Sequence, residues 1–454
     1  MIIDLDKKTH PFMSLSLKIS ASPFGTMKER YIKRMRQMDS KSRIQTTLDA
    51  FNSIGATTDG MQRLAYTEEE SRVHAVFSEF CVKENLQVRT DEAGNVIARR
   101  EGRMKEAPAV AVGSHLDTVY SGGKYDGAGG VAAGIELIHR LNEKKVMTDY
   151  PIELIAFAGE ESSRFGLATI GSKAMTGLLK AQDTKQFKDK DGISLETAMN
   201  TAGFPSSTLG QAVREKSAFH AFIELHIEQG RELERKGRKV AIATGIAAPT
   251  RLKVTVEGEA AHSGTTPMDI RRDALTSASR LVLDIEEAAD QEKKYQTVAT
   301  VGVFHVFPGA MNTIPGRVEF NVDIRGLDVS SKQRIITAVK KKSRQLQTEK
   351  DVEVSFDLLR DEQPILLDEN IQQLLAASCR EVSVDPLFLP SGAGHDAMNM
   401  ASICPTGLLF VPSYKGISHN PDEYTAAEDF VTGVDVLEQA VMKLAGAKEV
   451  KMSG

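Results

Sequence analysis

Imidazole and carboxylate side chains follow four short apolar runs that lie far apart in the chain. GSHLDTVYSGGKYDG places a histidine and two aspartates after the first run, and AGEESSRFG places two adjacent glutamates after the second. ELHIEQG and KGISHNPDEYT place one histidine after each of the other two. The residues are His115, Asp117, Asp126, Glu160, Glu161, His226 and His419. Carboxylates and imidazoles without thiolates suit Zn²⁺, Mn²⁺, Co²⁺ or Ni²⁺, so the pattern predicts a divalent metal site.

Each of these signals has a structural alternative when it is taken alone. A histidine at a strand end is more often a hydrogen-bonded structural residue, and an adjacent glutamate pair is usually solvated. DGAGGVAAG also carries the spacing of a dinucleotide-binding loop. Its glycines follow a long loop rather than a strand, however, which that fingerprint does not allow. We interpret them instead as letting a helix begin tightly beside Asp126.

The four apolar runs are expected to be strands of an α/β sheet, because ligands bind at the carboxyl ends of strands in open sheets. Continuously apolar runs are typical of strands buried on both faces. Alternation of strands and amphipathic helices predicts mixed or parallel pairing. We expect strands over residues 95–99, 109–112, 152–158, 219–225 and 407–411. We expect helices over residues 29–54, 68–83, 127–141 and 371–381, and a terminal helix.

The pattern changes after Gly245, where apolar and polar residues alternate as in half-buried strands. The order β-α-β-β-α-β, with helices at 269–289 and 332–347, is the ferredoxin-like split arrangement. Pro249 and Pro364 stand at its two ends. We therefore predict an inserted α+β domain over residues 248–362. The catalytic domain would comprise residues 29–247 and 363–454, which agrees with two domains for 454 residues.

Composition excludes several classes of protein. A net charge of −5 offers no electrostatic footprint for nucleic acid or an anionic membrane. No apolar run approaches the ~18–20 residues that span a bilayer. The cysteines Cys81, Cys379 and Cys404 stand far apart, which argues against a disulfide framework and a thiolate zinc site. A cytoplasmic protein is the expectation.

The first 28 residues show no uninterrupted apolar segment of the kind found in signal peptides. We expect a disordered leader there, or a segment upstream of a true start at Met27.

Nine segments together carry a resemblance to a known family. They are GSHLDT, GGKYDGAGG, GEESSRFG, ELHIEQG, GEAAHSGTTPM, FPGAMNTIP, DIRG, SGAGHDAM and SHNPDEYT. The chain resembles the M20 metallopeptidase-like family from about residue 40 onward. Within it, ELHIEQG and SGAGHDAM resemble the amidase/hydantoinase/carbamoylase branch rather than the peptidases of the same fold.

The resemblance implies two divalent metal ions per subunit. His115 and His226 would each bind one ion, Asp126 would bridge them, and Glu161 and His419 would complete the second site. Two such ions ~3.5–4 Å apart lower the pKa of a shared water towards ~7. Glu160 would be the general base and later the acid. Asp117 is a candidate to hold the imidazole of His115 in place.

The resemblance also implies residues that bind the substrate. His262 would stabilise the tetrahedral oxyanion, and the planar fork of Arg325 would pair with a substrate carboxylate. Gln229 and Asn312 match positions that hydrogen-bond the ureido and carboxylate ends. Gly392 and Gly394 would let the backbone approach the ligand closely. In relatives the inserted domain also forms a homodimer contact, and some of these groups reach the partner's site.

The predicted reaction is hydrolysis of a ureido C–N bond in a small carboxylate. An N-carbamoyl-L-amino acid is the first choice, and allantoate or ureidoglycolate is the alternative. GIAAPTRLKV, EESSRFG and VPSYKGISHNPDEY look like ureidoglycolate amidohydrolases, whereas SGAGHDAM looks like carbamoylases and allantoate enzymes. A dipeptidase or aminoacylase of the same fold would use the same metals but would not need Gln229. A non-catalytic homologue would have lost a ligand or Glu160, and none is missing.

Overall fold

The structure is a computed structural model that describes residue 35 and residues 37–447. The leader expected over residues 1–28 lies outside the described residues. No helix in the described part of the chain is long and apolar enough to cross a membrane.

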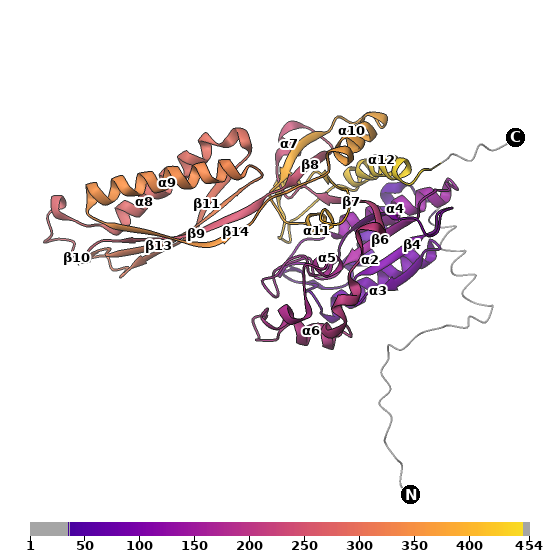
Figure 1. Ribbon diagram of the computed structural model, residues 1–454, viewed down its shortest axis with the longest axis horizontal. Coiled ribbons are helices and arrows are strands. Elements are labelled where there is room, and N and C mark those ends of the chain that lie inside the picture. Colours follow the sequence, from indigo (N-terminus) through magenta and orange to yellow (C-terminus); the bar gives the residue numbers. More distant parts are fainter. Residues whose placement is uncertain (1–34, 36, 448–454) are drawn as a thin grey trace, which may run out of the picture.

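Within the described residues, nine strands form one mixed sheet in the larger part of the molecule (Figure 1). Its order is β15-β8-β17-β7-β5-β6-β4-β3, with β16 also paired to β8. The strands are β3 (Gln87–Thr90), β4 (Val96–Arg100), β5 (Ala109–His115), β6 (Ile152–Phe157), β7 (Phe219–Ile227), β8 (Ala241–Ile246), β15 (Ile365–Leu366), β16 (Leu387–Ser391) and β17 (Thr406–Val411). The predicted α/β class with a central mixed sheet is confirmed.

Four neighbouring strands of this sheet run parallel. β17 pairs with β7, β7 with β5, and β5 with β6, each in parallel register. Every residue of β5 and β6 is buried, as the unbroken apolar runs predicted. The carboxyl ends of all four strands therefore meet at one edge of the sheet.

Helices cover both faces of the sheet. One hydrophobic cluster includes Phe51, Phe77, Leu137, Leu375 and Leu437. These residues come from α2 (Ser40–Asn52), α3 (Glu68–Lys83), α4 (Ala128–Glu143), α10 (Glu369–Glu381) and α12 (Ala427–Leu444). A second cluster on the other face takes residues from α5 (Ile170–Met175), α7 (Glu232–Lys236) and α11 (Asp396–Met400). The helix α6 (Leu195–Thr201) belongs to a third, smaller cluster, and β1 (Ala56–Thr57) pairs with β2 (Gly60–Met61).

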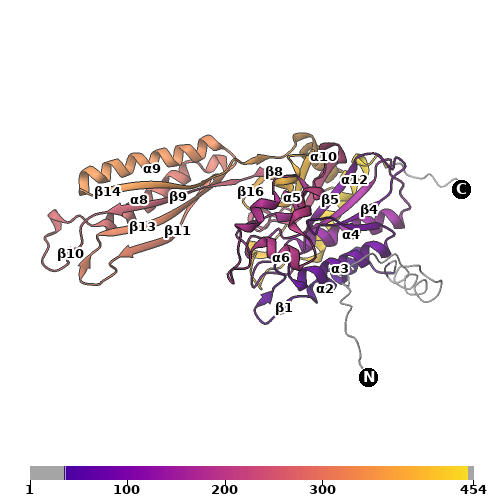
Figure 2. The same cartoon turned by 60° about the horizontal axis from the view of Figure 1, so that its bottom comes forward.

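Residues 248–362 form an elongated second part with its own hydrophobic cluster (Figures 1 and 2). Its antiparallel sheet has the order β11-β13-β9-β14. The elements are β9 (Ala248–Glu257), α8 (Ala274–Gln291), β11 (Val298–Phe307), β13 (Arg317–Gly326), α9 (Val329–Lys350) and β14 (Glu353–Asp361). Burial alternates along β13, because α8 and α9 cover one face only. A short pair, β10 (Ala261–His262) with β12 (Thr313–Ile314), lies at the end far from the larger sheet.

A buried lysine joins the two connections between these parts. The amine of Lys332, which is 2% exposed, donates to the carbonyl oxygens of Ala248 and Glu362 at 3.2 and 3.1 Å. Those residues begin β9 and follow β14. The neck of the molecule is thus held by charge-assisted hydrogen bonds.

Two helix boundaries expected from the sequence are wrong. The helix expected over residues 29–54 lies partly outside the described residues. Within them, residues 37–39 are not helical and α2 begins at Ser40, because Asp39 is extended and its side chain accepts the amide of Ser42 as the N-cap. The helix expected from residue 269 begins five residues later, because Asp273 caps α8 in the same way. The hydrophobic period continues through both caps, so the period alone did not reveal them.

A glycine contact fixes the distance between α4 and β7. A Cβ added at Gly130 would lie 2.0 Å from the carbonyl oxygen of Leu225, the residue before His226. At Gly134 in the same helix, the nearest atom would be a Leu154 methyl group 3.2 Å away. We expect Gly130→Ala to lower the free energy of unfolding by about 1–3 kcal/mol through overpacking.

Gly134→Ala is the matched control, since alanine favours a helix interior by about 1 kcal/mol over glycine. Urea unfolding followed by circular dichroism measures both variants. Equal stability of the two variants would contradict the contact.

Candidate metal centre

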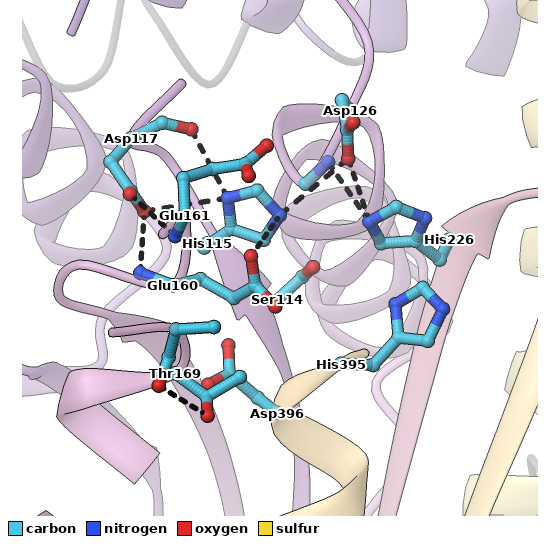
Figure 3. A network of polar contacts seen from close by, with 12 residues as sticks. Ser114, His115, Asp117, Asp126, Glu160, Glu161, Thr169, His226, His395 and Asp396 are labelled. Atoms are coloured by element: carbon cyan, nitrogen blue, oxygen red, sulfur yellow. Dashed lines mark hydrogen bonds and ion pairs between the residues drawn. The ribbon is translucent and has the colours of Figure 1, made fainter. Parts of the chain in front are cut away.

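The parallel strand ends bring together side chains that are up to about three hundred residues apart in the chain. His115 ends β5, His226 is the penultimate residue of β7, and Glu160 and Glu161 follow β6. His419 stands in the loop after β17. Figure 3 shows the imidazoles and carboxylates pointing toward one another.

Asp126 lies at the middle of the cluster, just before α4. Its Oδ1 is 3.0 Å from Nε2 of His226 and 3.6 Å from Nε2 of His115. Its Oδ2 is 3.1 Å from Nε2 of His419, which in turn is 3.1 Å from Oε1 of Glu161. Asp126 therefore offers one oxygen to each of two histidine groups, as a bridging carboxylate requires.

Two candidate ligand sets share this aspartate. One comprises His115, Asp126 and His226, and the other Asp126, Glu161 and His419. Within each set the ligand atoms lie within 4.8 Å of one another. All these residues are buried except His419, whose side chain is 48% exposed. The exposed histidine marks the side from which solvent and a ligand can enter.

The cluster concentrates negative charge in a buried space. Among the described residues, no lysine or arginine forms an ion pair with Asp117, Asp126, Glu160 or Glu161. Buried carboxylates need a compensating charge or a metal. The donor set of imidazoles and carboxylates therefore fits divalent cations, by its charge as well as by its geometry.

The surroundings shift the pKa values of Glu160 and Asp126 in opposite directions. Burial raises the pKa of Glu160 well above its usual value, despite the opposing charge of His115, and Glu161 adds to the rise. Burial also acts to raise the pKa of Asp126, but hydrogen bonds from three histidines hold it well below its usual value. Glu160 thus suits proton transfer, and Asp126 suits a permanent anion.

Asp117 fixes the backbone of the two glutamates. Its Oδ1 and Oδ2 accept the backbone amides of Glu160 and Glu161 at 3.0 and 2.9 Å. Its backbone oxygen lies 3.1 Å from Nδ1 of His115. This contact orients Nε2 of His115 toward the cluster. The predicted orienting partner of His115 is thus in contact with it, through the backbone as well as the side chain.

Gln229 lies beside the cluster in a left-handed conformation, with φ of 56°. Its amide nitrogen donates to Oδ2 of Asp126 at 2.9 Å, and its backbone amide donates to Ser413 at 3.0 Å. Its carbonyl Oε1 has no hydrogen-bond partner within the described structure. A buried acceptor without a partner is rare, so this oxygen is available to a ligand or a water molecule.

Two supporting residues were not singled out from the sequence. Oε1 of Glu423 accepts the backbone amides of Tyr125 and Asp126 at 2.8 and 3.0 Å. The hydroxyl oxygen of Ser418 lies 2.9 Å from Oδ2 of Asp126 and 3.0 Å from Oε2 of Glu423, so its single proton can be donated to either carboxylate. Both residues belong to the segment that carries His419. Their roles follow from contacts across the fold, which spacing along the chain does not reveal.

Arg325 lies at the neck, near the loop that precedes α11. Its Nη1 donates to the carbonyl oxygen of Gly392 at 2.9 Å, and its other nitrogens contact Asp323. A Cβ at Gly392 would meet nothing within 4 Å, and one at Gly394 only a methionine sulfur at 3.7 Å. The loop is therefore open, and no protein atom requires a glycine at these positions.

His262 and Asn312 do not join the site within one chain. His262 belongs to β10, and the backbone oxygen of Asn312 accepts the amide of Ser263 at 3.0 Å. Both residues are exposed at the far end of the four-stranded sheet (Figure 1). The larger part of the same chain does not reach them.

Comparison with known proteins agrees with the family resemblance found in the sequence motifs. The family model described as peptidase family M20/M25/M40 matches residues 111–443. This chain belongs to that family. The predictions of the M20 family and of a hydrolase are thereby confirmed.

Relatives named for an activity are similar to this chain over almost its whole length. The N-carbamoyl-L-amino acid amidohydrolase of Geobacillus stearothermophilus is 42% identical over 85% of this chain and 94% of its own length. The allantoate amidohydrolase of Bacillus subtilis is 35% identical over 90% and 99%. A hydantoinase/carbamoylase family amidase from Burkholderia ambifaria superposes with a TM-score of 0.84 at 33% identity, covering 90% and 98%. Plant relatives are named ureidoglycolate hydrolases.

Metal binding is directly testable. A ligand that binds only the folded state at a hundred times its Kd stabilises that state by about 2.7 kcal/mol. We expect Zn²⁺ or Mn²⁺ to raise the Tm of chelator-treated protein, and Asp126→Asn to abolish this rise.

The exposed Asp422 lies near His419 in sequence but outside both ligand sets, so Asp422→Asn is the control. Differential scanning fluorimetry with and without metal makes the measurement. A full metal-induced shift in Asp126→Asn would rule out the bridging role.

Proposed function

We propose that this protein is a dinuclear metal-dependent amidohydrolase that cleaves the ureido C–N bond of a small carboxylate, first of all an N-carbamoyl-L-amino acid. The observation that carries the proposal is Asp126 between two ligand sets, with Glu160 beside them and with Gln229 donating to Asp126 while its own Oε1 has no partner in the described structure. The alternatives are allantoate and ureidoglycolate. A dipeptidase or aminoacylase activity is a less favoured alternative.

In this proposal the five ligands hold two divalent ions, Zn²⁺ or alternatively Mn²⁺, Co²⁺ or Ni²⁺. His115 and His226 would together hold one ion, Glu161 and His419 would hold the other, and Asp126 would contribute to both sets. Such ions supply Lewis-acid polarisation of the carbonyl and a water of lowered pKa. Asp117 and Glu423 keep the ligands in place through the hydrogen bonds already described.

Glu160 moves the protons. Its Oε2 lies 3.8 Å from Nε2 of His115, at the edge of the ligand cluster. It accepts a proton as water attacks the ureido carbon, and then donates that proton to the leaving nitrogen as the C–N bond breaks. The products are the free amine and carbamate, which decomposes to CO₂ and ammonia. The raised pKa of Glu160 favours both halves of this cycle.

Substrate recognition uses both parts of the chain. Oε1 of Gln229 can accept a hydrogen bond from the ureido NH₂ group. Arg325, one loop from the site, offers a planar donor fork to the substrate carboxylate. Residues 248–362 then act as a lid above the site. Gly392 and Gly394 line the open loop between them.

The similarity to an N-carbamoyl-L-amino acid amidohydrolase supports the first choice of substrate. All three substrate classes carry a ureido group and a carboxylate, so Gln229 and Arg325 serve each of them. The choice among them therefore depends on the side of the substrate that neither residue contacts.

A substrate panel tests the proposal. The metal-loaded protein is assayed for ammonia release from N-carbamoyl-L-amino acids, allantoate and ureidoglycolate, and for cleavage of dipeptides. We expect the highest kcat/KM on a carbamoyl-amino acid, and Glu160→Gln to lower kcat by about 10²–10⁴-fold. Faster cleavage of dipeptides than of every ureido substrate would overturn the proposal. An unchanged kcat in Glu160→Gln would refute the role of Glu160 as general base.

The same panel tests Arg325. Arg325→Ala removes the donor fork, so kcat/KM should fall for carboxylates but much less for the corresponding amides. A loss of about 1.5–3 kcal/mol, or 10- to 150-fold, is expected for a charged hydrogen bond. Equal losses on acids and amides would contradict the role.

We propose further that the protein works as a homodimer through residues 248–362. The edge strand β11 exposes Val303, Phe304 and Phe307, each 37–46% exposed. Unpaired apolar edges of this kind are suited to a second copy. A partner would also bring His262 and Asn312 to the site that their own chain leaves without them. His262 would then stabilise the oxyanion in trans.

Complementation measures this directly. Glu160→Gln and His262→Ala chains are inactive alone, but each mixed dimer contains one complete site if His262 acts in trans. Random mixing should restore about one quarter of the wild-type activity, since half of the dimers are mixed and each has one working site. Activity no greater than the sum of the separate variants would place His262 in cis or outside the reaction.

A further inference from the structure

The segment that carries Glu160 leaves the sheet before it reaches the site. The last paired residues of β6 are Ala156, opposite Val96, and Phe157, opposite His115. Residues 158–161 are buried yet have no strand partner. Their backbone amides would be left unsatisfied unless other groups accepted them, and such orphaned amides are rare.

Side chains from outside the strand accept all four amides in turn. Oδ1 of Asn95 accepts the amide of Ala158 at 3.0 Å, and Oε1 of Glu70 accepts that of Gly159 at 2.8 Å. The two oxygens of Asp117 accept the next two amides, as described above. The backbone turns at Gly159, whose φ is +58°.

The carbonyl groups of the same segment are held as well. The amides of Thr169, Ile170 and Gly171, at the start of α5, donate to the oxygens of Glu160, Gly159 and Ala158 at 2.6, 2.9 and 2.8 Å. Residues 158–161 thus have little freedom on either side. The position of Glu160 is therefore determined by groups that belong to neither of the two ligand sets.

Glu70 connects this segment to α3. Thr67 caps the helix by accepting the amide of Glu70, and Oε2 of Glu70 accepts the amide of Tyr66. Its two oxygens therefore serve two backbone segments at once. Such a reciprocal arrangement at a helix start resembles a capping box, but here one oxygen is directed to Gly159 instead of the helix.

Asn95 is held with similar completeness. Its amide nitrogen donates to Oδ2 of Asp91 at 2.9 Å and to the carbonyl oxygen of Gly171 at 3.1 Å. A Cβ at Gly171 would lie 2.0 Å from Oδ1 of Asn95, so only glycine fits beside it. The side chain therefore cannot rotate away from Ala158 without disturbing its neighbours.

We propose that Glu70 and Asn95 are positioning residues for the general base: together they clamp the backbone of residues 158 and 159, and so fix where the carboxylate of Glu160 lies. The inference rests on the proposed function, because it assigns Glu160 the proton transfers. Asp117 completes the clamp from the other side.

The placement of Glu70 carries an electrostatic cost that a purely structural cap would avoid. Burial, together with the nearby charge of Asp117, raises the pKa of Glu70 to about 8. A helix cap at the surface would satisfy Tyr66 without burying a carboxylate. The buried position is required by the contact with Gly159.

Glu70→Gln tests the clamp. The amide keeps the size of the side chain but leaves one of the two backbone amides facing an NH₂ group. A displacement of about 1 Å can reduce a rate by 10²-fold. We expect kcat on the preferred ureido substrate to fall roughly 10- to 100-fold at saturating metal, while KM changes less than about threefold. Glu68→Gln, which removes an exposed carboxylate from the same helical turn, is the matched control and should leave kcat unchanged.

Two further measurements separate positioning from stability. In a Glu160→Gln background, Glu70→Gln should lower kcat by less than about twofold, because residues that act through one group are not additive. Hydrogen exchange of residues 158–161 should be faster in Glu70→Gln than in Glu68→Gln, whether or not the enzyme is active. Asn95→Ser removes the acceptor of Ala158 without touching Glu70, and it should give the same pattern if Glu70→Gln does not fold.

The outcomes distinguish this inference from the function on which it rests. Unchanged kcat and unchanged exchange, with only a lower Tm, would overturn the clamp and make Glu70 a helix cap. If the wild-type protein hydrolyses no ureido carboxylate but Glu70→Gln still exchanges faster at residues 158–161, the proposed reaction is refuted and the clamp is retained.

Discussion

The structure depends on gathering several buried carboxylates at one point. Asp117, Asp126, Glu160 and Glu161 lie together without lysine or arginine partners in the described structure, which is unfavourable in a medium of low polarity. Imidazoles offset part of this repulsion, and divalent cations are suited to offset the rest. Every supporting contact around the site can be understood from this one constraint.

The backbone of the sheet edge supplies much of the compensation. Asp117 accepts two amides, Glu423 accepts two more, and Glu70 a further two. Hydrogen bonds to ionised groups are the stronger kind, so they both stabilise the anions and orient them. Rigidity and charge compensation are therefore produced by the same contacts. This explains why carboxylates that do not face the ligand are buried around the site.

Residues 248–362 differ from the sheet that carries the metal centre. Their open sheet and single layer of helices build no metal site, and their far end presents His262 and Asn312 to solvent. Arg325 lies at the other end, where β13 meets the neck. The two ends of this part thus carry polar groups at very different distances from the metal centre. The buried Lys332 holds the neck through which the two parts are joined.

Local patterns in the chain were sufficient for the buried strands and for the chemistry at their ends. Largely apolar runs predicted β5, β6, β7 and β17, because strands covered on both faces consist mainly of apolar residues. The helix boundaries at Ser40 and Ala274 were missed, because an aspartate cap is a single polar residue within a continuing hydrophobic period. Glu423, Glu70 and Asn95 could not be predicted as supporting residues, since their partners are backbone amides distant in sequence.

The sequence by itself determined the family and the types of the candidate ligand residues, since these depend on residue identity and on motifs a few residues long. Only the tertiary structure decided that four parallel strands end at one edge, that Asp126 lies between two histidine groups, and that His262 and Asn312 are remote from them. The physical reason is that strand order and register arise from packing over the whole sheet. Which side chains finally meet is a property of that packing, and no single segment contains it.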